Sequence, residues 1–277
     1  MITVMDAGQV SLDFGPIQMT IRALAGSSPL TKQAQQAAHY AMEVLYELAA
    51  YQKTAASPQL AIRDGNDWPV VLKRMLAAVQ QAGDITLTPM AAVAGTIADL
   101  TADWLLARGA TKAIVNNGGD IAIRLATGQK TAVGVGPAIG RQPTHKLVLD
   151  DSRGIGGVAT SGLGGRSFTK GIATAAIVAA GTAAVADACA TSLGNATYVG
   201  HPAVKLAWAE QLDPNTDIWG HQVVTEVGVL PPPVVEVALM NGWSRATELY
   251  NQGIIAGAAV FVQEQLIMVP EGFVIAL

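Results

Sequence analysis

Residues 112–125 read KAIVNNGGDIAIRL, and this stretch decides the fold class. Two β-like runs, at 113–115 and 121–125, flank the turn Asn116-Asn117-Gly118-Gly119-Asp120. Asn, Gly and Asp favour tight turns between strands because they tolerate a left-handed backbone. The stretch therefore predicts two neighbouring strands. Gly and Asp clusters separate further β-like runs at 132–135, 146–149 and 157–160.

Outward from this stretch, hydrophobic periodicity predicts long helices and a few more strands. Partial alternation over 10–24 about Gly15-Pro16 predicts a hairpin. Toward the C-terminus, 234–240 and 254–262 have the pattern of strands. Helices and strands do not alternate as regular βαβ units, which favours an α+β fold with a mostly antiparallel sheet and a single core. Helices are expected over 31–53 with Thr31 as N-cap, over 68–81, over 89–107 and, fully buried, over 172–193.

Composition excludes several classes of function. The 277 residues are 51% hydrophobic and 14% charged, with a net charge of −4 and no Lys/Arg cluster, so we expect no nucleic-acid partner. The apolar stretch at 172–186 is shorter than the ~20 residues that cross a bilayer, so we expect no membrane partner. Cys189 is the only cysteine, and the N-terminus lacks a signal-peptide pattern. We therefore expect a cytoplasmic protein, and its charge-poor surface predicts a homo-oligomer.

Residues 186–191, ADACAT, place two oxygen-bearing side chains in an otherwise apolar segment. Asp187 and Thr191 are four residues apart, so on a helix they share one face. A buried carboxylate is costly unless it is paired or binds a metal, and Mg²⁺ prefers one or two carboxylates together with waters and phosphate oxygens. The pair predicts either a magnesium site or a structural hydrogen bond or salt bridge.

Two glycine-rich segments each admit a functional and a structural interpretation. Gly118 and Gly119 let the backbone approach a ligand while Asp120 can accept hydrogen bonds or bind a metal, or the three simply form a tight hairpin turn. The end of the 157–160 run, Thr160-Ser161-Gly162, can cradle a phosphate through hydroxyls and N–H groups, with Arg166 nearby, or it can be a structural loop. Ser161 does not lie in a GxSxG elbow, which disfavours a serine hydrolase.

Taken in order, these segments resemble the ApbE flavin-transferase superfamily, whose members transfer FMN from FAD to a threonine of a target flavoprotein. Residues 93–99 resemble the family's helix pattern, and Gly118-Gly119-Asp120, Thr160-Ser161-Gly162 and Asp187 with Thr191 follow. The resemblance is carried by residues 89–195 and points to an uncharacterised, divergent branch. It implies Mg²⁺ held by Asp187, Thr191 and the carbonyl near Ala91. It also implies FAD against the two glycine-rich segments.

The chain departs from the family pattern in two places. Ala94 stands where the family has a lysine, and Gly164-Gly165-Arg166-Ser167 occupies the region of the family's His-Ile-Ile-Asp-Pro segment. Arg166 or Lys170 could replace the missing positive charge. The sequence therefore supports a Mg²⁺-dependent enzyme that acts on FAD or a related nucleotide, by FMN transfer or pyrophosphate cleavage. The alternative is a catalytically degenerate binding protein for a flavin or another small anionic metabolite.

Overall fold

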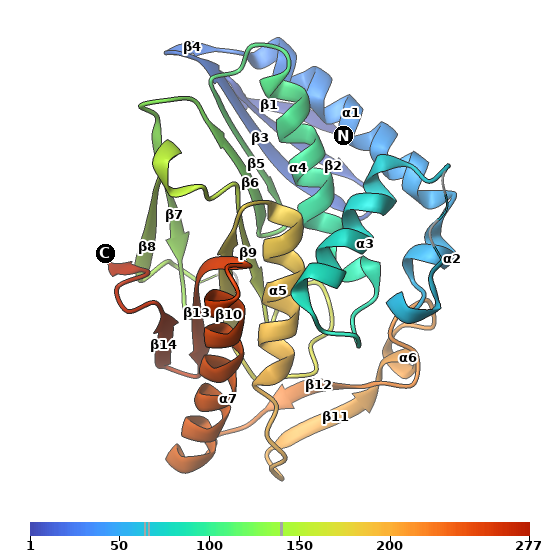
Figure 1. Cartoon of the computed structure of the whole chain (residues 1–277), viewed down its shortest axis with the longest axis vertical. Helices are drawn as coiled ribbons and strands as arrows, with labels where there is room; N and C mark the ends of the chain where they lie inside the picture. The colour runs from blue at the N-terminus through green and yellow to red at the C-terminus, as the bar shows by residue number, and fades with distance from the viewer. Residues whose placement is uncertain (64, 66, 139–140) are drawn as a thin grey trace.

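One large antiparallel sheet organises the computed structural model, which describes residues 1–277 apart from 64, 66 and 139–140 (Figure 1). Its strand order is β1-β2-β3-β5-β6-β9-β10-β13-β14, with β4 paired to β3. Strands β11 and β12 form a separate hairpin, and β15, β8 and β7 form a three-stranded sheet. The α+β class and the mostly antiparallel sheet expected from the sequence are confirmed.

The strands are β1 (Ile2–Asp6), β2 (Gln9–Phe14), β3 (Ile17–Ala25), β4 (Ser28–Pro29), β5 (Lys112–Asn117), β6 (Asp120–Leu125), β7 (Lys130–Val135), β8 (His145–Asp150), β9 (Gly157–Ser161), β10 (Ala175–Ala180), β11 (Val204–Trp208), β12 (Gln222–Val227), β13 (Ile255–Val262), β14 (Gln265–Val269) and β15 (Ile275–Ala276). The α-helices are α1 (Thr31–Ala49), α2 (Gln52–Ala55), α3 (Val70–Ala82), α4 (Val93–Leu106), α5 (Ala183–Ala196), α6 (Ala209–Leu212) and α7 (Pro232–Asn251). Short 3₁₀ turns are η1 (Gln59–Ala61), η2 (Pro89–Ala92) and η3 (Asp151–Arg153).

The expectation of one buried helix over 172–193 is wrong, because this region contains a strand and then a helix. Strand β10 is buried at every position, and its side chains alternate between the two hydrophobic clusters on either face of the sheet. A strand buried on both faces is continuously apolar, which hides its period of two. Helix α5 begins after Gly181, where the Thr182 hydroxyl accepts a hydrogen bond from the Val185 N–H at 3.2 Å. The pair Gly181-Thr182 marks the boundary between strand β10 and helix α5 in the sequence.

The strand expected over 234–240 is also wrong, because these residues belong to α7. A proline run forms the N-cap and the first two residues of this helix, where proline is favoured because its fixed φ suits a helix start. Buried positions Val235, Ala238, Leu239 and Gly242 then recur at helical spacing. The seven residues considered alone were too few to reveal this period.

Thr31 begins α1, but it does not provide the N-cap expected from the sequence. The cap residue is Leu30, with no side-chain hydrogen bond to the helix. The Thr31 hydroxyl instead accepts a hydrogen bond from the Gly8 N–H at 2.8 Å. Thr31 therefore ties the β1–β2 turn to the helix.

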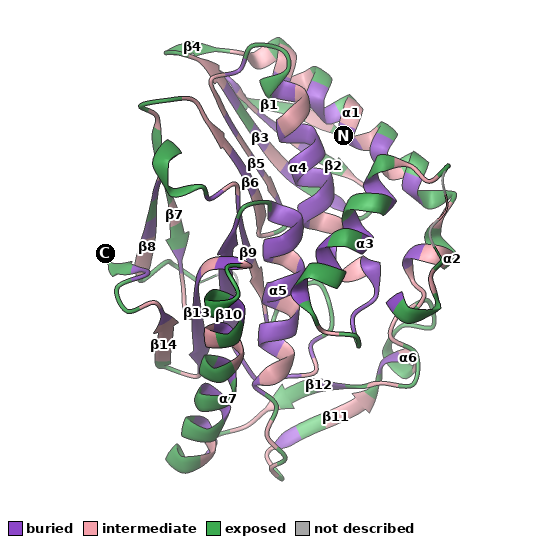
Figure 2. Cartoon of the chain, in the orientation of Figure 1, coloured by how far each residue is buried: buried purple, intermediate pink, exposed green. Residues whose placement is uncertain are grey.

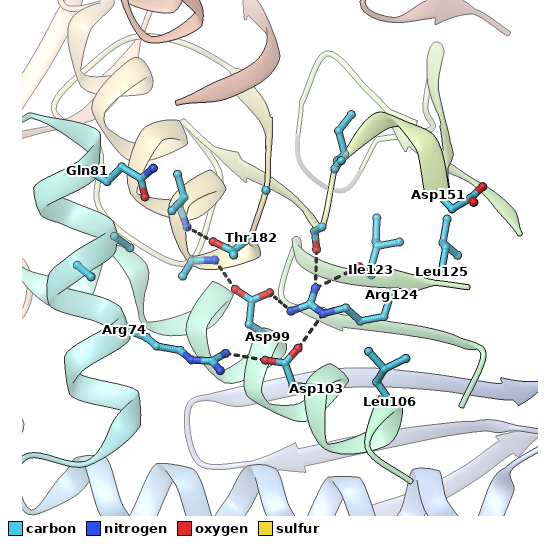
Figure 3. Close-up of a pocket in the computed structure, with 18 of the residues that line it drawn as sticks. Arg74, Gln81, Asp99, Asp103, Leu106, Ile123, Arg124, Leu125, Asp151 and Thr182 are labelled. Atoms are coloured by element: carbon cyan, nitrogen blue, oxygen red, sulfur yellow. Dashed lines mark hydrogen bonds and ion pairs between the residues drawn. The ribbon is translucent and has the colours of Figure 1, made fainter. Parts of the chain in front are cut away.

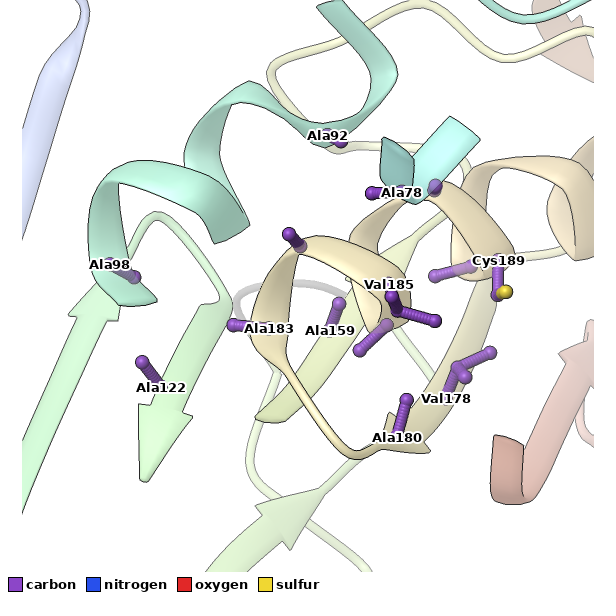
Figure 4. Packing of buried hydrophobic residues seen from close by; sticks show 14 of the residues in the cluster. Ala78, Ala92, Ala98, Ala122, Ala159, Val178, Ala180, Ala183, Val185 and Cys189 are labelled. Atoms are coloured by element: carbon purple, nitrogen blue, oxygen red, sulfur yellow. The ribbon is translucent and has the colours of Figure 1, made fainter. Parts of the chain in front are cut away.

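Small side chains let the central helices lie close to the sheet. Figure 2 shows α4 and α5 largely buried, and the contacts of α4 with β5 and β6 and of α5 with β9 and β10 place both on one face. Alanines fill the space between these layers, including Ala98, Ala122, Ala159 and Ala183 (Figure 4). The opposite face of β6, β9, β10 and β13 is covered by the β7–β8 sheet, where Leu147 and Leu149 join the smaller cluster. In the described part of the chain, no helix has the length and apolar composition needed to cross a membrane.

The first turns of α4 and α5 exchange hydrogen bonds with an aspartate of the opposite helix. The Gly95 N–H of α4 donates to the Asp187 carboxylate of α5 at 3.0 Å. The Ala184 N–H of α5 donates to the Asp99 carboxylate of α4 at 2.8 Å. First-turn N–H groups have no partner within their own helix, so each aspartate satisfies a donor that the other helix leaves free. This reciprocal capping fixes both helices around Asp187.

The close approach of α4 and α5 requires glycine at position 95, and we expect Gly95→Ala to destabilise the protein. An added Cβ would lie 2.2 Å from the Ala183 carbonyl oxygen, so the backbones would have to separate. Overpacking of this kind costs about 1–3 kcal/mol or more, and urea unfolding followed by circular dichroism measures it. Gly194→Ala on α5 is the matched control, since its Cβ would meet nothing nearer than 3.7 Å. An equal loss of stability in both variants would contradict this account of the crossing.

Candidate functional site

Asp187 and Asp120 lie together in a cavity of about 330 Å³. Asp187 comes from the second turn of α5, and Asp120 is the first residue of β6, directly after the Gly118-Gly119 turn. Thr191 lies one turn beyond Asp187 and lines the same cavity, as does Ala91 of η2. The structure therefore brings together the three residues that the resemblance implied as Mg²⁺ ligands, and it adds a second carboxylate.

The two carboxylates oppose each other's ionisation. Burial raises the pKa of Asp187 well above its ordinary value, and the nearby Asp120 carboxylate raises it further. Burial also raises the pKa of Asp120, to about 7, although the Thr160 backbone N–H and the Arg166 guanidinium oppose the rise. Two like charges held this close are stabilised by a cation between them.

The donor set in this cavity fits a hard, oxygen-seeking cation. The Asp187 carboxylate accepts the Gly95 N–H bond through Oδ2 and a further bond from the Ala94 N–H, and the residue also lines the cavity. The Thr191 hydroxyl, the Asp120 carboxylate and the Ala91 main chain add further oxygen atoms around the cavity. In the part of the chain that the structure describes, no group of three or more His, Cys, Asp or Glu side chains is placed to hold a metal. The structural hydrogen bond and the magnesium hypothesis for Asp187 are therefore compatible.

Gly118 and Gly119 form the hairpin turn between β5 and β6. Their φ angles are +70° and +113°, a region that favours glycine, and the Asn116 side chain accepts a hydrogen bond from the Gly119 N–H at 2.9 Å. The turn thus has the structural role considered from the sequence, and it also directs Asp120 into the cavity. The structural interpretation therefore applies to the glycines, and the functional interpretation stays a prediction for Asp120.

Arg166 bridges two hairpin turns at the edge of the cavity. Its Nη1 donates to the Pro16 carbonyl at 2.9 Å, and its guanidinium lies so close to Gly118 that an added Cβ there would be 2.1 Å from Nη2. The side chain remains exposed and lines the cavity that contains Asp120 and Asp187. Arg166 therefore provides a positive charge beside the carboxylates.

The Thr160-Ser161-Gly162 segment lies beside the carboxylate cavity. The Thr160 backbone N–H bonds to Asp120, so the segment positions a residue of the site. Among the described residues that line the cavity, none comes from this segment. Gly162, at φ +128°, lines a separate hollow of about 420 Å³ between the following loop and β12. Of these three residues, Thr160 therefore contacts the site through Asp120, whereas Gly162 lines a different hollow from Asp187 and Thr191.

Lys170 is a second positive group that lines the cavity. Its Nζ donates to the Thr86 hydroxyl at 3.1 Å. Burial lowers the pKa of Lys170, while the carboxylates of Asp84 and Asp217 act in the opposite direction. Ala94 also lines this cavity, so Lys170 provides a positive charge in the same cavity as the alanine that stands in place of the family's lysine.

Sequence reasoning missed the segment 213–218, which contributes Asp213 and Asp217 to the cavity wall. The Thr88 hydroxyl, just before η2, donates a hydrogen bond to the Asp217 carboxylate. The segment follows α6 and lies outside every motif that could be read from the sequence. Only the three-dimensional contact with Thr88 identifies it as part of the site.

Cys189 points away from this chemistry. It is fully buried in the main hydrophobic cluster, and burial raises the pKa of its thiol to about 12. A thiol with so high a pKa is not a nucleophile at neutral pH. Cys189 is the small core residue expected from its alanine-rich surroundings.

A second cavity of about 630 Å³, between α3, α4 and β6, contains a saturated charge network (Figure 3). The Arg124 guanidinium donates to Asp99 at 2.9 Å, to Asp103 at 2.8 Å and to the Gly156 carbonyl at 2.9 Å. Arg74 pairs with the other oxygen of Asp103 at 2.7 Å. Burial raises the pKa of Asp99, and Arg124 counters this by favouring the charged form. Since these groups already have partners, the network is structural.

Comparison with models of known protein families identifies the family of this chain. The family model described as AbpE bacteria matches residues 2–268. The chain belongs to this family. The resemblance to the ApbE superfamily inferred from four short motifs is confirmed by this match, and the AbpE bacteria model extends it far beyond residues 89–195.

Relatives of this chain include archaeal proteins named UPF0280. The protein of Methanococcoides burtonii is 40% identical over 146 residues, which cover 52% of this chain and 59% of that protein. The protein of Methanosphaerula palustris is 34% identical over 190 residues, which cover 66% of this chain and 75% of that protein. The chain spans little more than half the length of the first curated relatives it matches.

Two solved structures share the fold of the AbpE bacteria chain at low sequence identity. Flavin transferase ApbE from Vibrio cholerae is 12% identical, with a TM-score of 0.51 over 94% of this chain and 95% of that chain. Flavinyl transferase ApbE from Pseudomonas stutzeri, in its apo form, is 13% identical, with a TM-score of 0.52 over 97% and 94%. These likenesses show a shared fold. An inference about activity has to come from the residues of the site.

The charge network yields a prediction about stability. We expect Arg124→Met to lower the free energy of unfolding by about 3–5 kcal/mol, because it leaves the buried Asp99 carboxylate without its partner. Arg74→Met is the matched control, since Arg74 is 42% exposed and an exposed pair contributes about 0–1 kcal/mol. Chemical denaturation of both variants measures the difference. Similar losses in the two variants would show that burial of Asp99 does not control the energy of this network.

Proposed function

We propose that this protein is a Mg²⁺-dependent enzyme that acts on FAD or a related nucleotide diphosphate. The observation that carries the proposal is the meeting of Asp187, Thr191, Ala91 and Asp120 in one cavity with Lys170 and Arg166 at its edge. Carboxylate and hydroxyl oxygens suit a divalent cation, and the two positive side chains suit phosphate oxygens. The relationship to the ApbE superfamily supports a flavin nucleotide over other diphosphates.

Each residue of the cavity has a role in this proposal. Asp187 and Thr191 hold the cation from one face of α5, with the Ala91 carbonyl as a third ligand and Asp120 beside them. Bound Mg²⁺ supplies neutralisation of the charge that develops on the diphosphate. The Gly95 N–H keeps the Asp187 carboxylate oriented toward the cavity through its 3.0 Å hydrogen bond. Lys170 and Arg166 position the phosphates by charge.

The reaction cleaves the bond between the two phosphates. With water as the acceptor, FAD gives FMN and AMP. With the hydroxyl of a protein threonine as the acceptor, FMN becomes attached to that threonine through a phosphoester and AMP leaves. The partner in the second case is a flavoprotein that presents a threonine at the cavity.

Asp187→Asn provides the sharpest test of the proposed cation site. The amide oxygen of asparagine can still accept the Gly95 N–H bond, so the fold is retained while the negative charge is lost. We expect FAD affinity in the presence of Mg²⁺, measured by flavin fluorescence, to fall by about tenfold or more, the equivalent of about 1.4 kcal/mol. We also expect Mg²⁺ to raise the melting temperature of the unmodified protein and to leave that of Asp187→Asn unchanged.

Asp13→Asn is the matched control, because Asp13 is exposed on β2 and does not line the cavity. It should bind Mg²⁺ and FAD like the unmodified protein. Asp187→Asn binding both with unchanged affinity would overturn the proposed cation site. A chelator that leaves FAD binding intact would have the same meaning.

One observation favours a second function, that of a binding protein without turnover. Ala94 presents a methyl group to the cavity where the family pattern has a lysine, and Lys170 is partly neutralised by Asp84 and Asp217. A site with weakened positive charge can retain its ligand and lose the reaction. Chromatography of the nucleotides after incubation with FAD and Mg²⁺ separates the two functions, since AMP is released only by the enzyme.

A further inference from the structure

A further hollow of about 590 Å³, the Tyr198 hollow, has Tyr198 in its wall and adjoins the carboxylate cavity. The two share Thr86, Lys170 and Asn195 in their walls. The Asn195 side-chain oxygen accepts a hydrogen bond from the Lys170 backbone N–H at 2.9 Å, and the Lys170 Nζ donates to Thr86 at 3.1 Å. These two bonds fix Lys170 in the wall that the two hollows share.

The chemistry of the Tyr198 hollow differs from that of the carboxylate cavity. Its wall carries the Tyr198 ring, 41% exposed, the apolar side chain of Leu206 and the amide of Gln222. Arg245 also faces it, but its guanidinium is occupied by Ser192, Glu248 and the Ala82 carbonyl. An aromatic face with an amide nearby suits a flat heterocycle, which can stack on the ring and hydrogen-bond at its edge.

The dimensions of the two hollows suit one extended ligand. Ligand pockets for drug-sized molecules have volumes of about 300–1,000 Å³, and the carboxylate cavity, at about 330 Å³, lies at the lower end of that range. The two hollows together reach its upper part. A dinucleotide has two heterocycles joined through a diphosphate, and Lys170 places a positive charge at the junction between the hollows.

We propose that the Tyr198 hollow is the second compartment of the nucleotide site and takes one heterocycle of a dinucleotide whose diphosphate lies at Lys170. The inference rests on the proposed function, because it takes the carboxylate cavity as the place of the cation and the diphosphate. It adds a residue from the end of α5 and a residue from the β11–β12 hairpin to ligand recognition. Neither belongs to the motifs on which the family resemblance was based.

The test compares three probes, FAD, FMN and AMP, in the presence of Mg²⁺ by isothermal titration calorimetry. We expect Tyr198→Ala to weaken FAD binding by about tenfold or more, because stacking on an aromatic ring contributes that much to binding of a base. It should weaken only one of FMN and AMP, the half that occupies the Tyr198 hollow. The half that is weakened identifies the heterocycle.

Tyr250→Ala is the matched control, since Tyr250 is 38% exposed on α7 and outside the wall of the hollow. It should bind all three probes like the unmodified protein. Unchanged FAD affinity in Tyr198→Ala, with tight binding in the unmodified protein, would overturn the second compartment and leave the proposed function intact. Equal weakening of FMN and AMP would also overturn it. Absence of FAD binding in the unmodified protein would overturn the proposed function itself.

Discussion

The exchange of hydrogen bonds between the first turns of α4 and α5 is the constraint on which the rest of the structure depends. Asp99 caps α5 and Asp187 caps α4, and Gly95 permits the close approach that makes both bonds possible. A buried carboxylate is expensive unless it is bonded, so each aspartate is stable only where the other helix supplies its N–H groups. Arg124 then anchors Asp99 to the central sheet. Helices α4 and α5, at the two ends of the region 89–195 that carries the family resemblance, are thereby held in one arrangement.

This arrangement makes a structural residue available for chemistry. The Asp187 carboxylate accepts N–H bonds from the first turn of α4, and the residue also lines a cavity that contains Asp120 and Thr191. Burial raises the pKa of Asp187, the like charge of Asp120 raises it further, and a divalent cation would remove that repulsion. Stability and ligand binding are therefore coupled at one carboxylate. The account explains why a residue with a clear structural role can also belong to a binding site.

The sequence was informative where local chemistry determines structure. The turn at Gly118-Gly119 and the helical spacing of Asp187 and Thr191 follow from backbone preference and helix geometry, and the structure places them accordingly. The sequence was uninformative where tertiary burial determines structure, as in β10, whose uninterrupted apolar run hides a strand buried on both faces. The contributions of Asp217 and Tyr198 could not be foreseen, because they depend on loops and helix ends that only the folded chain brings to the cavity.

The most direct test of the central claim is to locate the cation in a crystal grown with Mn²⁺ in place of Mg²⁺ and with FAD. An anomalous difference map recorded at the manganese absorption edge shows the position of the ion independently of activity. The account predicts a peak bounded by Asp187 and Thr191, which disappears in crystals of Asp187→Asn. A peak at Asp213 and Asp217, or no peak in the cavity while FAD is bound, would contradict it.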